Sequence, residues 1–136
     1  MTEAEFKTEL KNPTGGYLLF GGEDYLKYNY SRQIAKRVLD GTFDEFNHII
    51  LYGEEFTPAA LSQAIYALPM MAEKKLVVIK NSGIFKSAGE EVKAFWQERL
   101  SDIPDYVLLV FDEQEVVPDE ISYMSSFYFD EILYAS

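Results

Sequence analysis

The chain has 136 residues, of which 48% are hydrophobic and 15% aromatic, and its formal net charge at pH 7 is −11. This length and apolar content predict one globular domain with its own core and exclude a disordered chain. The absence of cysteine excludes disulfides, a thiolate nucleophile and a cysteine metal site, and the single histidine excludes a histidine-rich site. We therefore expect no metal and no cofactor.

The negative charge argues against a domain that holds nucleic acid by its phosphates, because such binding needs clustered lysine and arginine. The charge is uneven, since residues 112–136 contain seven acidic side chains and no basic one, which leaves −4 for the rest. No apolar run approaches the roughly 20 residues that span a bilayer, and the acidic N-terminus does not resemble a signal peptide. These features predict a cytoplasmic protein without a membrane segment.

The first half of the chain alternates strand and helix patterns. Residues 17–20 (YLLF) form an apolar run closed by two glycines, which is typical of a buried strand and a tight turn. Apolar residues then recur every four positions and predict an amphipathic helix that ends at Asp40-Gly41. This stripe consists of Leu26, Tyr30, Ile34 and Val38.

The same alternation continues through the middle of the chain. Residues 46–52 (FNHIILY) predict a second strand, closed by Gly53. Thr57 and Pro58 then combine a capping hydroxyl with a proline suited to the first helical position. We expect the helix that follows to bury Leu61, Ile65 and Leu68.

Two more strands and one more helix complete the predicted domain. Residues 76–80 and 105–111 are apolar strand patterns, and residues 89–100 between them have helical spacing. Nearly continuous apolar strands alternating with helices predict an α/β domain with a doubly wound, mostly parallel sheet and helices on both faces. We place this domain at residues 1–113. Residues 114–136 form an acidic, aromatic segment that is either a closing helix or an end that belongs against something absent.

The connector at residues 68–75 (LPMMAEKK) is unusual. Connectors between helices and strands favour Gly, Asn or Asp, whereas this one follows the predicted helix end with Met70 and Met71. From the residues alone, the pair is either the lip of the core or an exposed knob for a partner's pocket. Methionine suits the second role because its unbranched thioether adapts to irregular clefts.

The first turn partly matches a phosphate-binding loop. Gly21 and Lys27 fit the pattern, but Leu26 stands where the second glycine belongs and Tyr28 where the magnesium-binding hydroxyl belongs. Acidic residues in the turn, Asp24 among them, would also repel phosphate. We therefore predict that Lys27 is a solvated surface charge and that this nucleotide-binding architecture has lost its nucleotide site.

Asp112 and Glu113 follow the fourth strand and resemble the magnesium site of an ATPase. In a phosphate-loop ATPase of this layout, however, these carboxylates would follow the third strand, where Lys80 and Asn81 stand. We predict that Asp112 and Glu113 are helix-cap or surface carboxylates.

The remaining titratable residues form no catalytic constellation. His48 lies inside an apolar strand and is predicted to be a core or edge histidine rather than a general base. The other charged residues are predicted to be solvated: the loop carboxylates Asp44, Glu45, Glu54 and Glu55, and the basic rim of Lys74, Lys75, Lys80 and Lys86.

Four segments together resemble the N-terminal domain of the bacterial DNA polymerase III delta subunit, the clamp-loader wrench. They are residues 17–26 (YLLFGGEDYL), 51–55 (LYGEE), 68–81 (LPMMAEKKLVVIKN) and 106–111 (YVLLVF). The resemblance covers residues 15–113 and is most specific in the third segment. It implies an AAA+-like (P-loop NTPase-like) domain without a functional P-loop, which neither binds nor hydrolyses ATP and has no catalytic site.

The resemblance also implies a partner. Delta binds the ring-shaped sliding clamp (beta) and helps to hold it open for loading onto primed DNA during replication. The family's contact is an apolar pair at the end of the helix before the third strand, which falls on Met70 and Met71, with Leu68 and Pro69 beside it. DNA is implied only indirectly, and other clamp-loader subunits bind through domains absent from this chain.

The chain departs from the family in three places. The apolar pair is often aromatic, but here it is Met-Met, and the basic segment after the fourth strand is replaced by an acidic one. The family's lid and collar domains do not fit in 136 residues.

The alternative function is a divergent nucleotide-binding or hydrolysing P-loop-like domain. A third is a receiver-like domain with Asp112 in an acidic pocket, which lacks the expected lysine after its last strand.

Overall fold

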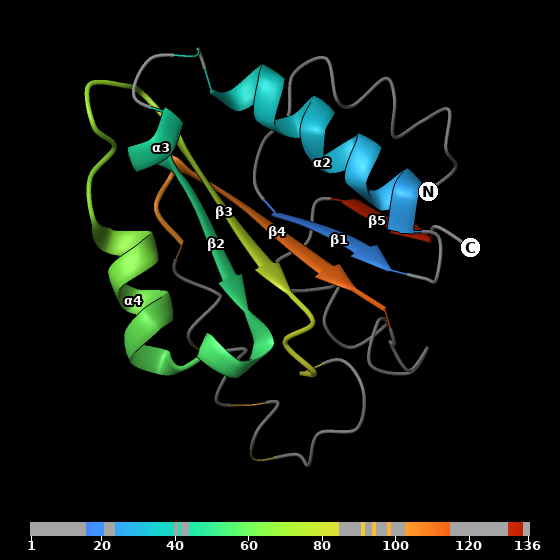
Figure 1. Ribbon diagram of the computed structural model, residues 1–136. Helices are drawn as coiled ribbons and strands as arrows, with labels where there is room; N and C mark the ends of the chain where they lie inside the picture. Colours follow the sequence, from blue (N-terminus) through green and yellow to red (C-terminus); the bar gives the residue numbers. More distant parts are fainter. Residues whose placement is uncertain are drawn as a thin grey trace.

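The computed structural model describes residues 16–20, 24–39, 41, 44–84, 91, 94, 98, 103–114 and, for the backbone alone, 131–134 (Figure 1). In this part of the chain the strands form one parallel sheet in the order β2-β3-β4-β1-β5. The strands are β1 (Gly16–Phe20), β2 (His48–Tyr52), β3 (Lys75–Lys80), β4 (Val107–Glu113) and β5 (Glu131–Tyr134).

The fourth strand lies between the first and the third, so the sheet order differs from the chain order. Phe20 is the register partner of Glu113, and Lys80 is the partner of Asp112. Because the strands are parallel, their carboxyl ends meet at one edge of the sheet. The polar residues that follow β3 and β4 are thereby brought to the start of the helix that follows β1.

Helices cover both faces of the sheet, as the sequence predicted (Figure 1). On one face α2 (Asp24–Val38) packs Tyr30 and Ile34 against the sheet. On the other, α4 (Pro58–Tyr66) packs Leu61 and Ile65. The period of two in each strand separates the two cores. The α2 side receives Tyr17, Leu19, Leu76, Val78, Leu108 and Val110, and the α4 side Leu18, Val77, Ile79, Leu109 and Phe111.

Helix α4 begins as predicted and ends earlier than expected. Thr57 accepts a hydrogen bond from Ala60 N at 3.1 Å, which satisfies one of the free amides of the first turn. The helix ends at Tyr66 and Ala67 is already extended. Leu68 therefore leaves the predicted buried stripe and is 80% exposed, so its assignment to the core was wrong.

The second strand begins later than predicted. Residues Asp44–Asn47 form the short helix α3, and β2 starts only at His48. The Asp44 carboxylate accepts a hydrogen bond from Gly41 N at 3.0 Å, and Gly41 has φ of 85°, a conformation open to glycine. This local turn competes with strand pairing for Phe46 and Asn47. Glu45, Glu54 and Glu55 are exposed as expected, whereas Asp44 is half-buried.

Several predictions fall on other parts of the chain. Residues 131–134 form a strand that pairs in parallel with β1. From the sequence, this segment was expected to be either a closing helix or an end that belongs against something absent. Of the predicted helix at 89–100, the three residues Glu91, Ala94 and Glu98 are described and are helical; the rest, with the glycine turn at 21–22, lies outside the described residues. Among the helices that are described, none is long and apolar enough to cross a membrane.

Candidate protein-binding site

The connector between α4 and β3 exposes large apolar side chains. Leu68 is 80% exposed, Met71 75% and Met70 45%, and Pro69 is half-buried between them. We call these four residues the wedge. Of the two alternatives for the methionine pair, the lip of the core does not fit side chains this exposed. Such an apolar cluster on a surface is typical of a site that contacts another molecule.

The backbone of the wedge is held by the side chain of Asn47. Its Nδ2 donates to Met70 O at 2.8 Å, and its Oδ1 accepts from Met70 N at 2.6 Å. Asn47 lies at the end of α3 and is only 1% exposed. A single buried amide thus satisfies both polar groups of the Met70 backbone, which are the groups that an irregular connector otherwise leaves to water.

Two further side chains hold the carbonyls that α4 leaves free at its C-terminus. Lys75 Nζ donates to Ala67 O at 2.7 Å, and the Tyr106 hydroxyl donates to Tyr66 O at 3.1 Å. A cation is favourable at this end of a helix because the carbonyls carry partial negative charge. The prediction that Lys75 is solvated was wrong: it is 2% exposed, and burial lowers the pKa of its ammonium.

Met71 adopts a backbone conformation that non-glycine residues rarely take. Its φ is 51°, in the left-handed region, where the Cβ atom meets the following carbonyl. Asn81, just after β3, is the other such residue in the described chain, with φ of 55°. Asparagine tolerates this conformation well, whereas methionine does not. The fold therefore holds the backbone of the wedge at Met71 in a conformation that methionine does not favour.

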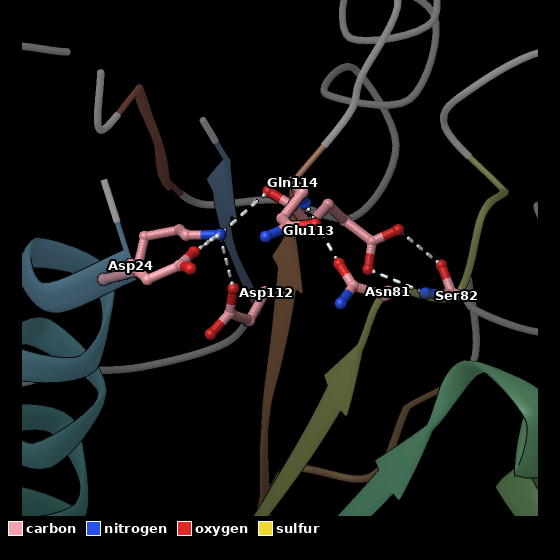
Figure 2. A network of polar contacts seen from close by, with 7 residues as sticks. Asp24, Asn81, Ser82, Asp112, Glu113 and Gln114 are labelled. Atoms are coloured by element: carbon pink, nitrogen blue, oxygen red, sulfur yellow. Dashed lines mark hydrogen bonds and ion pairs between the residues drawn. The ribbon is translucent and has the colours of Figure 1, made fainter. Parts of the chain in front are cut away.

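The second cluster of interest lies at the carboxyl edge of the sheet, around Lys27. Its Nζ lies 3.0 Å from Asp112 Oδ1 and 3.5 Å from Asp24 Oδ1, and it donates to Glu113 O at 3.3 Å (Figure 2). Lys27 is 2% exposed. The prediction of a solvated charge was wrong. The first turn of α2 lies over the ends of β1 and β4, and Lys27 is there paired with the carboxylates of Asp112 and Asp24.

Glu113 fastens the end of β4 to the loop after β3. One carboxylate oxygen accepts from Ser82 N at 2.9 Å, and the other accepts from Ser82 Oγ at 2.8 Å (Figure 2). The second oxygen also accepts from Gly83 N at 3.1 Å. Burial raises the pKa of Glu113, the hydrogen bonds oppose that rise, and the charge of Asp112 adds to it. The prediction of a surface carboxylate was wrong for Glu113, which is 1% exposed.

A cavity of about 300 Å³ lies between α2 and the ends of β3 and β4. Its lining carries two lysines and two aspartates, so the formal charges cancel and offer no net attraction to phosphate. The residues that line it are Asp24, Lys27, Tyr28, Ser31, Lys80, Asn81, Asp112 and Gln114. Within the described ranges, no three His, Cys, Asp or Glu residues are grouped so that they could hold a metal ion.

Comparison with known proteins identifies the family. The family model described as "DNA polymerase III, delta subunit" matches residues 17–120 of the 136. The chain belongs to the DNA polymerase III delta family. No curated protein matches the sequence significantly.

Solved structures support the same fold. The Bacillus subtilis DNA clamp loader delta protein is similar to this delta-family chain with a TM-score of 0.79 at 19% identity, over 97% of this chain and 42% of that one. A DNA polymerase III gamma subunit-related protein from Thermotoga maritima is similar with a TM-score of 0.65 at 11% identity, over 98% of this chain and 45% of that one. The chain thus spans less than half the length of each of these two proteins, and the predicted P-loop-like α/β fold is confirmed.

Some of the residues around the exposed connector were predictable and others were not. The sequence singled out the wedge residues, and the model places them together on one exposed connector. His48 lies in β2, which pairs only with β3 among the described strands, and burial lowers its pKa. Asn47 and Tyr106 were missed, because no local pattern indicates that a side chain will bond to a backbone more than 20 residues away.

Proposed function

We propose that this chain is the part of a clamp-loader delta subunit that binds the sliding clamp. The wedge enters a hydrophobic pocket of the clamp, and the subunit thereby helps to hold the ring open for loading onto primed DNA. The observation that carries the proposal is the exposure of Leu68, Met70 and Met71 on one connector. The membership of the chain in the delta family supports the choice of partner.

The wedge has enough apolar surface to anchor such a complex. Burial of a methionine side chain contributes about 1.5–3 kcal/mol by area. Met71 starts from 75% exposure and has most of this to gain, whereas Met70, at 45%, has less. A few well-buried anchors commonly dominate an interface, and methionine adapts to the pocket it enters. The Met-Met pair is thus suited to this role without an aromatic ring.

In this proposal the domain is a non-catalytic, cytoplasmic binding module. The internal neutralisation of Lys27 and the balanced charge of the adjoining cavity support a role without nucleotide chemistry. Other clamp-loader subunits bind through parts of the delta subunit beyond this chain, and DNA is met only through the clamp. Nothing in this role needs a cofactor.

The direct test is calorimetric titration of the chain with the sliding clamp of its own organism. We expect binding by the wild type and a loss of at least about a hundredfold in affinity for the double variant Met70→Ala/Met71→Ala, since about 3 kcal/mol corresponds to that factor. Circular dichroism and thermal unfolding should show an intact fold, because both side chains lie largely outside the core.

A matched control separates the wedge from general stickiness. Tyr25 is 75% exposed, as Met71 is, but it belongs to α2, which packs on the other face of the sheet from α4. Tyr25→Ala should leave clamp affinity unchanged. Absence of binding by the wild type, or an equal loss in the Tyr25 and methionine variants, would contradict the proposal.

A further inference from the structure

We infer that Asn47 is a positioning residue of the clamp-binding site, whose side-chain amide sets the wedge in its binding conformation before the clamp arrives. The inference rests on the proposed function. Asn47 makes no exposed surface of its own, since it is 1% accessible. Its effect on a partner therefore has to pass through the backbone of Met70, the residue it holds.

The geometry makes the contact specific to an amide. Both atoms at the end of the side chain are used: Nδ2 donates to Met70 O at 2.8 Å and Oδ1 accepts from Met70 N at 2.6 Å. A hydroxyl cannot reach both groups at once, and a carboxylate would place a second acceptor against the Met70 carbonyl. The Asn47 amide thus bonds to both the N–H and the C=O group of one residue, as the backbone of a neighbouring strand would.

The held residue is the one that precedes the strained position. Met71 has φ of 51°, and the side chains of Met70 and Met71 are two of the apolar groups proposed to enter the clamp. A left-handed methionine persists only where its neighbours fix the backbone on at least one side. The Asn47 amide supplies this fixation on the N-terminal side, at Met70. Without it, the connector is free to relax to conformations in which the two side chains point elsewhere.

The other holding contacts lie at the C-terminal end of α4. Tyr106 and Lys75 fix the carbonyls of Tyr66 and Ala67, before the wedge begins. They fix where the connector leaves α4 but not the turn at Met70 and Met71. Within the described part of the chain, the two hydrogen bonds between Asn47 and Met70 are the ones that hold the backbone of the wedge.

Preorganisation of this kind has a quantitative consequence. If the competent conformation is populated at a fraction f, the apparent dissociation constant is the intrinsic one divided by f. Removal of the amide should therefore weaken clamp binding by the factor by which it lowers f. We expect this factor to be about tenfold or more, with most of the loss in the association rate.

The test measures both quantities on the full chain. NMR measures the hydrogen-exchange rate of the Met70 amide in the absence of the clamp. Surface plasmon resonance measures the affinity and association rate for the clamp. We expect Met70 N–H to be protected in the wild type and to lose most of that protection in Asn47→Ala and Asn47→Ser, with clamp affinity lower by about tenfold or more. Ile34→Val, a mild destabilisation in the core on the α2 side, should change neither quantity.

The outcomes separate the inference from the proposed function. A freed Met70 amide with unchanged clamp affinity in the folded Asn47 variants would overturn the positioning role and leave the wedge standing. Rapid exchange of Met70 N–H in the wild type would overturn it even if no Asn47 variant folds. Failure of the wild type to bind the clamp would instead remove the proposed function, a result visible before any variant is compared.

Discussion

Lys27 on α2 and Asp112 on β4 form a buried ion pair, with 3.0 Å between Nζ and Oδ1 and a lysine side chain that is 3% exposed. In a phosphate-loop protein, the lysine near this helix start reaches the phosphates of the nucleotide. Here the cation is used within the protein, and it joins the helix to the strand on which the sheet is centred. Lys27, the residue that most resembles a nucleotide-binding lysine, therefore has a structural role.

Removal of either partner of this pair should destabilise the fold. Lys27→Met leaves the largely buried Asp112 carboxylate without its cation, and we expect a loss of about 2–4 kcal/mol in the free energy of unfolding. Chemical denaturation of single and double variants would measure the coupling, and Lys27→Met/Asp112→Asn should recover part of the loss. Asp24→Asn is the control: that carboxylate is 70% exposed and should cost at most about 1 kcal/mol. Additive losses in the double variant would argue against coupling.

The same pair predicts that the domain does not respond to nucleotide. The cavity beside Lys27 is lined by Asp24 and Asp112 as well as by Lys80, so a triphosphate would face both carboxylates. We expect no change in melting temperature when ATP and Mg²⁺ are added at millimolar concentration. A known nucleotide-binding ATPase in the same plate would serve as the positive control. A saturable shift that Lys27→Met abolishes would favour the alternative of a divergent nucleotide-binding domain.

The fold was predictable because its signals are local and repeated. The apolar run of residues 17–20 and the stripe of Tyr30 and Ile34 each reflect burial against the sheet, and each pattern led to the observed element. Boundaries were less predictable. Leu68 continues the helical spacing, but the carbonyls of Tyr66 and Ala67 accept hydrogen bonds from Tyr106 and Lys75, which lie 40 and 8 residues further along the chain. No spacing in the α4 sequence shows these partners.

The site divides in the same way. The sequence pointed to Met70 and Met71, since two methionines on a connector are unusual by residue type alone. It did not show how charged residues would be buried. Lys27 and Lys75 look like surface lysines, because a lysine is rarely buried unless it is paired, and their partners come from other strands and loops. Tertiary pairing of this kind needs the topology and not merely the pattern.

Glu113 should make stability depend on pH in the direction opposite to a surface carboxylate in an ion pair. Burial raises the pKa of Glu113 in the folded state above its ordinary value of 4.5. The folded state therefore holds this proton more tightly than the unfolded chain, and the free energy of unfolding falls as the pH rises from about 4.5 through the folded pKa. Glu113→Gln cannot ionise, so it should lack this component.

Urea denaturation of both proteins across pH 4.5–7.5 would measure the effect. The free energy of unfolding of the wild type, taken relative to Glu113→Gln, should fall as the pH increases. Glu54→Gln, an exposed carboxylate, should leave the slope as in the wild type. If the free energy of unfolding of the wild type, relative to Glu113→Gln, instead rises with pH, then the hydrogen bonds from Ser82 and Gly83 outweigh burial.

The left-handed backbone of Met71 predicts a trade between stability and binding. Glycine takes φ of 51° without the clash of a Cβ atom, which costs other residues about 1–2 kcal/mol, although it also gains freedom in the unfolded chain. Since Met71 is 75% exposed, little burial is lost. Met71→Gly should therefore raise the free energy of unfolding by up to about 1 kcal/mol and weaken clamp binding about tenfold or more.

Met71→Ala separates the two effects, because alanine removes the apolar side chain but keeps the strained backbone. It should match glycine in the loss of clamp affinity and fall below glycine in stability, as measured by urea denaturation. If Met71→Ala proves as stable as Met71→Gly, the backbone at this position is not strained in solution. If Met71→Gly is both more stable and a weaker binder, then the strain is retained for the partner, because a methionine that is 75% exposed contributes little burial to the isolated fold.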